Sequence, residues 1–260
     1  MNTNTYALVT GASSGMGVEF ARQLAERGYN LLITSNEEAI HTRAKEIQAD
    51  YPQVKVESVV MDLGRQHATR ELYEYTHAHG MEIEVLVNNA GVYHDCDILD
   101  DSEAFTRLII NLHTYTPAML CYLFGKDMRL RRKGYILNVC SVTDQMAAQR
   151  LGTYGGTKAF LSHFTRALHI ELKPYGVYVT NVRPGAVDTG LYKLSPGLTK
   201  IGKSLGIIVS PKTLARRGLR ALFKGRSQTT VPTVFWKILC FIILLIPTWM
   251  LRIIRKLGWF

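Results

Sequence analysis

The sequence predicts an α/β protein with a doubly wound parallel sheet. Six short runs rich in Val, Ile and Leu alternate with six longer stretches of helical character. The short runs are almost continuously apolar, which is typical of strands covered by helices on both faces. Strand–helix alternation repeated this often requires parallel strands joined by right-handed crossovers.

Each element is expected from its local pattern. The apolar runs predict strands at residues 6–10, 30–34, 54–61, 85–88, 135–140 and 178–182. The stretches between them predict helices over about 17–27, 37–50, 65–79, 102–130, 153–173 and 211–224. Gly28 lies just past the first helix, where glycine commonly ends a helix. Because no linker is visible within residues 1–230, we expect one domain over residues 1–232 and a tail over residues 233–260.

The composition is that of a folded domain with an uneven charge distribution. Of the 260 residues, 47% are hydrophobic and 20% are charged, which excludes global disorder. The formal net charge is +10, but residues 189–260 contain thirteen Lys and Arg and no acidic residue. The excess positive charge therefore belongs to the C-terminal part. Since neither a recognition helix nor a stacking motif accompanies it, no nucleic-acid partner is expected.

The tail contains an uncharged apolar run over residues 238–251, which Arg252, Arg255 and Lys256 follow. The run has fourteen residues and includes Pro247, whereas a spanning helix needs about twenty apolar residues. We therefore expect peripheral contact with an anionic membrane surface. The alternative is that the tail packs on the protein itself or closes a dimer interface. The N-terminal residues do not resemble a cleaved signal, so a cytoplasmic location, peripheral at the cytoplasmic face of a membrane, is expected.

The four cysteines and eight histidines predict neither a metal site nor a disulfide framework. They lie far apart, with no C-x-x-C pair and no cluster at metal-ligand spacing. We interpret the cysteines as free thiols in a reducing compartment.

The segment T-G-A-S-S-G-M-G at residues 10–17 lies between the first strand and the first helix. Glycines at such a turn let backbone N–H groups approach a pyrophosphate at the positive end of the helix. The spacing is G-x-x-x-G-x-G and differs from the G-x-G-x-x-G of many dinucleotide folds. Its position between a strand and an amphipathic helix indicates a dinucleotide site.

Tyr154 and Lys158 are four residues apart and would share one face of a helix. An ammonium group beside a phenol lowers the pKa of the phenol, which suits it to proton transfer with a substrate oxygen. Ser141 precedes Tyr154 by thirteen positions, and its hydroxyl would orient that oxygen. A lone Tyr-x-x-x-Lys is more often a solvated helix face. Together with the glycine turn, Ser141 and N-N-A-G at residues 88–91, it indicates an active site.

The order and spacing of these motifs resemble the short-chain dehydrogenase/reductase family over residues 5 to about 232. The matching elements are T-G-A-S-S-G-M-G, Asp62-Leu63, N-N-A-G, Asn111, Ser141, Tyr154, Lys158, Pro184-Gly185 and Thr189. The resemblance implies a Rossmann-like sheet of about seven strands and hydride transfer between a nicotinamide cofactor and an alcohol or ketone. A homo-oligomer, either dimer or tetramer, is expected as well.

The resemblance also implies roles for individual residues. Tyr154 would be the general acid/base, Ser141 would hold the substrate carbonyl, and Lys158 would bind the nicotinamide ribose and tune Tyr154. Asn111 would hold a proton-relay water near Lys158, and Asp62 would meet the adenine. The implied cofactor-binding residues are Gly11, Ser13, Ser14, Gly15, Met16, Gly17, Ser35, Asn36, Asp62, Leu63, Asn89, Ala90, Gly91, Tyr154, Lys158, Pro184, Gly185, Val187 and Thr189.

The choice of cofactor depends on the end of the second strand, where Ser35 and Asn36 stand. An acid there would bond the ribose 2′-hydroxyl and repel a 2′-phosphate. No acid occupies these two positions, and the basic residues common in NADP-binding relatives are also missing from them and from Ser14. NADP(H) is favoured, and NAD(H) is the alternative. Arg43 could turn towards this position, but a solvated place on its helix is the favoured interpretation of that residue.

The leading interpretation is an oxidoreductase that acts on a lipophilic ketone or secondary alcohol, such as a steroid, a bile acid, a 3-oxoacyl thioester or a sphingoid-like ketone. The alternative is a nucleotide-binding sensor or scaffold without turnover, against which the complete set of site residues argues. Four residues that follow sheet-end motifs are candidates for a substrate cleft, with ordinary loop packing as the equal alternative: Tyr93, His94, Leu151 and Tyr192. Gly155 and Gly156 follow Tyr154 and cost helix propensity, for which tight packing or close approach of the cofactor is one explanation.

Overall fold

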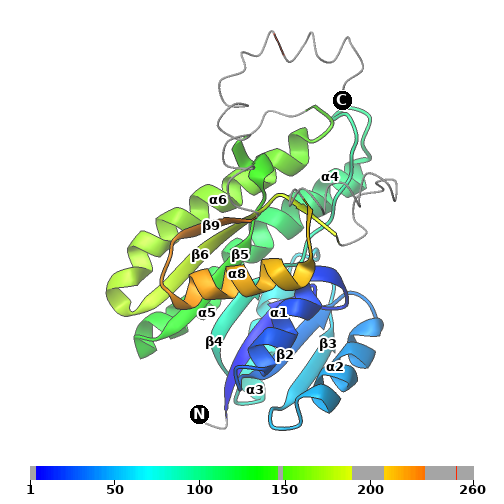
Figure 1. Ribbon diagram of the computed structural model, residues 1–260. Coiled ribbons are helices and arrows are strands. Elements are labelled where there is room, and N and C mark those ends of the chain that lie inside the picture. Colours follow the sequence, from blue (N-terminus) through cyan, green and yellow to red (C-terminus); the bar gives the residue numbers. More distant parts are fainter. Residues whose placement is uncertain (1–3, 146–148, 189–207, 232–249, 251–260) are drawn as a thin grey trace.

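The structure, a computed structural model, describes residues 4–145, 149–188, 208–231 and 250. Seven parallel strands form one sheet in the order β3-β2-β1-β4-β5-β6-β9, with helices on both faces (Figure 1). The predicted doubly wound α/β fold is confirmed. The tail lies outside the described residues apart from Met250, so its boundary and its role stay predictions.

The strands of the main sheet are β1 (Thr5–Thr10), β2 (Asn30–Ser35), β3 (Val56–Val60), β4 (Glu82–Asn88), β5 (Gly134–Val139), β6 (Val177–Pro184) and β9 (Gln228–Val231). The α-helices are α1 (Gly15–Ala25), α2 (Ala39–Asp50), α3 (Ala68–Ala78), α4 (Glu103–Ile110), α5 (Thr116–Arg131), α6 (Gly152–Leu172) and α8 (Pro211–Phe223). A small second sheet pairs β7 (Ala186–Val187) with β8 (Ile208–Val209). No helix among the described residues combines the length and the apolar character needed to cross a membrane.

Two hydrophobic cores hold the layers together. On β1, Ala7 and Val9 face one core, which α1, α2 and α8 cover, while Tyr6 and Leu8 face the other, which α3, α5 and α6 cover. Burying both faces requires apolar residues at successive strand positions, which is why the strands read as continuous apolar runs.

The strand order reverses between β1 and β4. From β1 the chain proceeds outward to β2 and β3, and β4 then pairs with the other side of β1. The loops that leave the carboxyl ends of these two strands therefore diverge and open a crevice, the usual ligand site of such sheets. The glycine-rich turn and the N-N-A-G segment both lie at this crevice.

The predicted helix over 102–130 is not one helix. A π-helical turn over Asn111–Tyr115 separates α4 from α5. Pro117 explains the interruption, because proline has no N–H to donate to the carbonyl of residue 113 and its ring crowds that carbonyl. Strand β9 was also absent from the prediction, since its sequence Q-T-T-V lacks an apolar run and, among the described strands, it pairs with β6 alone at the sheet edge. Three cysteines, Cys96, Cys121 and Cys140, are free thiols as expected.

Candidate active site

A cavity of about 350 Å³ begins at the glycine-rich turn and reaches the ends of β2, β3 and β4. Gly11 has φ of +65°, and a Cβ on it would lie 2.7 Å from Ala90 Cα, so the turn requires glycine here. Helix α1 begins at Gly15 in the cavity wall, and the Ser14 side chain makes no capping hydrogen bond. The first backbone N–H groups of α1 are therefore available to an anion.

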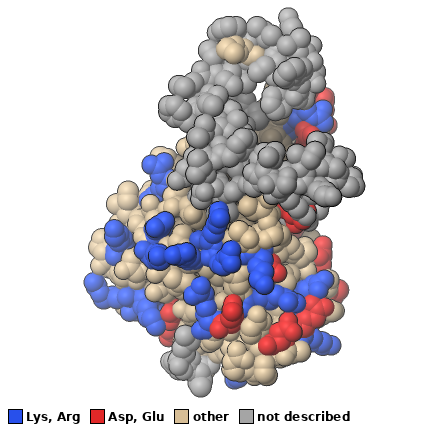
Figure 2. Space-filling model, in the orientation of Figure 1, with Lys and Arg blue, Asp and Glu red and all other residues tan. Residues whose placement is uncertain are grey.

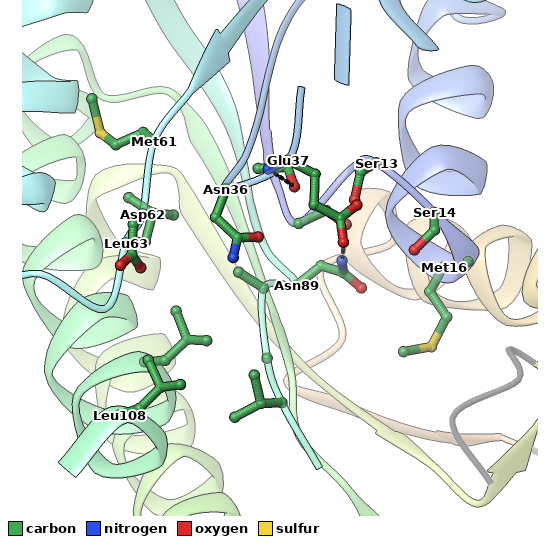
Figure 3. Close-up of a pocket in the computed structure, with 17 residues that line it drawn as sticks. Ser13, Ser14, Met16, Asn36, Glu37, Met61, Asp62, Leu63, Asn89 and Leu108 are labelled. Atoms are coloured by element: carbon green, nitrogen blue, oxygen red, sulfur yellow. Dashed lines mark hydrogen bonds between the residues drawn. The ribbon is translucent and has the colours of Figure 1, made fainter. Parts of the chain in front are cut away.

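Asn89 lies between the two sides of this cavity. Figure 3 shows it between Ser13, Ser14 and Met16 on one side and Met61, Asp62 and Leu63 on the other. Its side-chain amide donates to the carbonyl oxygens of Thr10 and Gly11, at 3.0 and 2.9 Å. Its Oδ1 is buried and has no hydrogen-bond partner within the described part of the chain. A glycine turn, a helix N-terminus and an unpaired acceptor along an elongated cavity fit a dinucleotide.

The wall of the cavity near β2 carries a carboxylate, and a guanidinium outside this wall contacts the glycine-rich turn. Glu37 lines the wall next to Ser35 and Asn36, and its backbone N–H donates to Ser35 Oγ at 3.2 Å (Figure 3). Arg43, from α2, donates through Nε to the carbonyl oxygen of Ser13 at 3.2 Å. Glu37 lies two positions past the end of β2 and was not predicted as a site residue from the sequence.

A second cavity of about 60 Å³ adjoins the first and contains the predicted catalytic groups. It is lined by Ser141, Tyr154 and Lys158 together with Pro184, Gly185 and Val187. Met16, Asn89, Gly91 and Val92 belong to the walls of both cavities, so the two spaces adjoin at these residues. The cavity that holds the tyrosine therefore borders the larger one.

Lys158 is the buried cation of this second cavity. Its side chain is 5% exposed, Nζ donates to the Val139 carbonyl oxygen at 3.0 Å, and Nζ lies 5.7 Å from the centre of the Tyr154 ring. Burial lowers the pKa of Lys158 to about 8. At neutral pH the ammonium form still predominates, and it stabilises a negative charge on the neighbouring phenol.

Ser141 lines the second cavity, and its hydroxyl oxygen accepts two hydrogen bonds. Its Oγ accepts hydrogen bonds from the backbone N–H of Thr143 at 3.2 Å and from Thr143 Oγ1 at 2.9 Å. Because both bonds are accepted, the Ser141 proton remains available to another acceptor, such as a carbonyl oxygen. Three residues on, Asp144 forms a buried ion pair with Arg183, whose Nε lies 2.8 and 3.0 Å from the two carboxylate oxygens. This pair joins the loop after β5 to the end of β6.

Most predicted site residues line the two cavities. Those of the larger cavity are Gly11, Ser13, Ser14, Gly15, Met16, Ser35, Asn36, Asp62, Leu63, Asn89, Ala90 and Gly91. Gly17 lines neither cavity but packs beneath the turn, where a Cβ would lie 2.1 Å from the Gly11 carbonyl oxygen. Asn111 also lines neither, and its side-chain amide donates to the Gly64 carbonyl oxygen at 3.4 Å. Its role with a relay water stays a prediction, and Thr189 and Tyr192 lie outside the described residues.

The candidate cleft residues differ in their surroundings. The ring of Tyr93 packs edge-on against Tyr154, with centres 5.3 Å apart. His94 instead pairs with Asp101 at 3.2 Å within its own loop, and half-buried Leu151 immediately precedes α6. At Gly156 a Cβ would meet no atom within 4 Å, so tight packing does not explain that glycine.

His113 is a site residue that the sequence analysis missed. It lines the second cavity and is 1% exposed, and its ring lies 5.6 Å from that of Tyr154. A single histidine in a helical segment carries no sequence pattern that would predict a buried position beside Tyr154. The described residues contain no group of three or more His, Cys, Asp and Glu that could hold a metal ion.

Comparisons with known proteins identify the family. The family model for short chain dehydrogenases matches residues 5–196. A very-long-chain 3-oxoacyl-CoA reductase of Coprinopsis cinerea is 34% identical over 243 residues, which cover 89% of this chain and 68% of that protein. Among solved structures, a short-chain dehydrogenase from Sphingobium yanoikuyae in complex with NADPH is 26% identical, with a TM-score of 0.78 over 90% of this chain and 91% of its own.

A second solved structure that is similar to this chain is also a dehydrogenase. The bulky-bulky ketone specific alcohol dehydrogenase from Comamonas testosteroni is 27% identical, with a TM-score of 0.78 over 92% of this chain and 91% of its own. The family match agrees with the glycine turn, the serine, the tyrosine and the lysine gathered at one crevice. The chain therefore belongs to the short-chain dehydrogenase family and is an NAD(P)-dependent oxidoreductase that acts on CH–OH groups.

Proposed function

We propose that this chain interconverts a lipophilic ketone and its secondary alcohol with NADP(H), and that a long-chain 3-oxoacyl thioester is the first substrate class to test. The observation that carries the proposal is the convergence of Ser141, Tyr154 and Lys158 on a small cavity that adjoins the larger one at the glycine-rich turn. The names of the Coprinopsis reductase and the Comamonas alcohol dehydrogenase both support a bulky or long-chain carbonyl.

In the reductive direction the residues of the chain move one proton. The residues of the larger cavity would hold a nicotinamide cofactor, which would supply the hydride for the carbonyl carbon. The Ser141 hydroxyl donates a hydrogen bond to the carbonyl oxygen and orients it. Tyr154 transfers its phenolic proton to that oxygen as the C–H bond forms, which completes the alcohol. The Lys158 ammonium stabilises the phenolate until Tyr154 regains a proton from solvent.

The test is a panel of ketones, followed by the absorbance of the reduced cofactor with NADPH and with NADH. The panel contains 3-oxoacyl-CoA thioesters of increasing chain length, a ketone with two bulky substituents, a steroid ketone and acetone. We expect turnover to rise with apolar bulk and Ser141→Ala to lose most of it. NADPH binding without oxidation by any ketone would overturn the proposal and support a sensor or scaffold.

The preference for NADP(H) is supported by Arg43, whose guanidinium lies beside the glycine-rich turn. Arg43→Gln should weaken NADPH binding about tenfold, the value of one charge-assisted hydrogen bond, and leave NADH binding unchanged. Ser35→Asp should reverse the preference by repelling the 2′-phosphate. Fluorescence titration of each variant measures both affinities. The NADP(H) proposal is contradicted if the wild-type protein binds NADH more tightly than NADPH and if Glu37→Gln removes that difference. Glu37 would then hold the ribose 2′-hydroxyl.

A further inference from the structure

His113 owes its buried position to the π-helical turn between α4 and α5. Such a turn inserts an extra residue into the helix, and π-turns occur frequently at functional sites. Here it directs the imidazole inward at 1% exposure, whereas the neighbouring Tyr115 is exposed. The imidazole thereby reaches the loop after β4 and the first turns of α6.

Three hydrogen bonds define the protonation state of this imidazole. The backbone N–H of Val92 donates to His113 Nε2 at 2.9 Å, so Nε2 carries no proton. Nδ1 then carries the proton and donates to Thr157 Oγ1 at 3.1 Å. Thr157 Oγ1 donates its own proton to the Tyr154 carbonyl oxygen at 2.8 Å. The directions are mutually consistent only for the neutral Nδ1–H tautomer.

The imidazole is also packed on both sides. A Cβ on Gly91 would lie 2.8 Å from His113 Nε2, so the loop after β4 approaches the ring as closely as a glycine allows. On the other side the ring meets Tyr154 edge-on at 78°. Burial, and secondarily the Lys158 ammonium, lower the pKa of His113 well below its usual value and keep it neutral. Gly91 and Val92 line both cavities. His113 therefore lies between this shared part of their walls and α6, the helix that carries Tyr154 and Lys158.

We propose that His113 is a positioning residue, which holds Tyr154 at a set place relative to the Gly91–Val92 wall through Val92, Thr157 and the ring contact. This rests on the proposed function, in which Tyr154 transfers the proton. Both imidazole nitrogens are already engaged, so His113 does not itself move protons during turnover. Its contribution is orientation, and a displacement near 1 Å at a reacting group costs about 100-fold in rate.

The kinetic test compares His113→Leu with the wild type on the ketone that the panel shows to be reduced fastest. We expect kcat to fall about 10- to 100-fold, while the Kd for NADPH, from fluorescence titration, stays unchanged. The loss should be the same factor at every pH from 6 to 9, because no titration of His113 is involved. His113→Gln keeps an acceptor for the Val92 N–H and should recover part of the loss. Each rate is divided by the fraction of the protein that binds NADPH, so that unfolded protein does not lower the apparent kcat.

Thr157→Val tests the link to α6 independently of the histidine. It removes the hydroxyl that joins His113 to the Tyr154 carbonyl and should lower kcat in the wild-type background. In the His113→Leu background Thr157→Val should not lower kcat further, because the link is already broken.

His169 is the matched control for His113, since it is a buried histidine on α6 whose Nδ1 lies 2.8 Å from the Val179 carbonyl oxygen. His169→Leu should lower thermal stability and leave kcat unchanged.

A spectroscopic readout needs no substrate. In protein with ¹⁵N-labelled histidine, the imidazole signal that is missing from His113→Gln should show a protonated Nδ1 and an unprotonated Nε2 from pH 5.5 to 8.5. The inference is overturned if that signal titrates in this range, if His113→Leu keeps wild-type kcat, or if His169→Leu loses as much. Should His113→Leu not fold, His113→Gln and Thr157→Val carry the same comparison. Failure of every ketone in the panel would overturn the proposed function alone, because the spectrum still reports on His113.

Discussion

Tyr154 is held by neighbours of three different kinds. The Lys158 ammonium lies beside its ring, and the rings of Tyr93 and His113 meet it edge-on. Its side chain is only 8% exposed, so one position of the phenol is strongly selected. For a proton donor this is useful, since the donor must lie within hydrogen-bond reach of the reacting oxygen.

Tyr154→Phe should abolish turnover and leave NADPH binding intact, because only the transferable proton and its oxygen are removed. General acid/base groups contribute about 100- to 10,000-fold, so kcat should fall by that range. Steady-state rates and fluorescence titration of NADPH measure the two quantities. If the variant keeps more than a tenth of the wild-type kcat, Tyr154 is not the proton donor.

The affinity for NADPH should depend on pH through Lys158. Its pKa of about 8 means that the ammonium is present below pH 8 and is lost above it. Because the ammonium would bind the nicotinamide ribose, the Kd for NADPH should be constant near pH 7 and rise towards about tenfold per pH unit above pH 8. Lys158→Met should bind more weakly and show no such rise. Titration at each pH decides the point, and an equal rise in the variant contradicts it.

At the scale of elements, Tyr154 and Lys158 lie on α6, whereas Ser141 lies on the loop that follows β5 at the carboxyl edge of the sheet. The 3₁₀ turn Val142–Gln145 follows Ser141, and its Asp144 binds Arg183 at the end of β6. The two side chains are 1% and 6% exposed, so each charge depends on the other for compensation. The pair therefore joins the serine loop to the Pro184-Gly185 wall of the second cavity.

Asp144→Ala should destabilise the protein by about 3–5 kcal/mol, because it leaves the Arg183 guanidinium buried and unpaired. Replacing both partners, Asp144→Leu with Arg183→Met, should recover most of this loss. Urea unfolding at pH 7 measures each variant. The control is Glu103→Gln, which breaks the exposed ion pair with Arg107 and should cost less than about 1 kcal/mol. Equal costs for the buried and the exposed pair would show that Asp144 is not needed.

At the scale of the whole molecule, positive charge gathers along α8. Figure 2 shows a band of Lys and Arg over the face where α8 lies in Figure 1. The exposed cations on and just after this helix are Lys212, Arg216, Arg217, Arg220, Lys224 and Arg226. Since no acidic residue follows Asp188, this charge is not balanced by its own segment. Such a surface attracts anionic lipid, which strengthens the expectation of peripheral membrane contact.

The membrane prediction is tested by flotation with liposomes at low salt. The full chain should float with anionic vesicles and remain soluble with zwitterionic ones, while a chain ending at Pro232 should float less. Reversing the charge of Arg216, Arg217 and Arg220 to Glu in the full chain should weaken flotation further, by about 1 kcal/mol or more per charge. Full-length protein that stays with the soluble fraction on anionic vesicles shows instead that the tail packs on the protein or between subunits. The expected homo-oligomer stays a prediction.

Much of the fold and of the site is determined by local sequence. Continuous apolar strands can be stable only between two layers of helices, so alternation by itself specified the doubly wound sheet. Gly11 and Gly17 belong to the segment that joins β1 to α1 and begins that helix, and Tyr154 and Lys158 share a helix face through their spacing. These features depend on neighbours within a few residues along the chain, which is why the sequence was sufficient to predict them.

Only the tertiary structure decided which distant residues meet. Strand β9 exists because β6 offers it an edge, and Glu37 becomes part of the cavity through the turn that follows β2. His113 is 41 residues from Tyr154 in the chain, and it joins the site because a π-helical turn and Pro117 rotate it inward. Contacts of this kind are selected by packing between elements, so no local periodicity or motif records them. For this reason the sequence determined the catalytic groups and the fold class, and the folded structure determined what holds those groups in place.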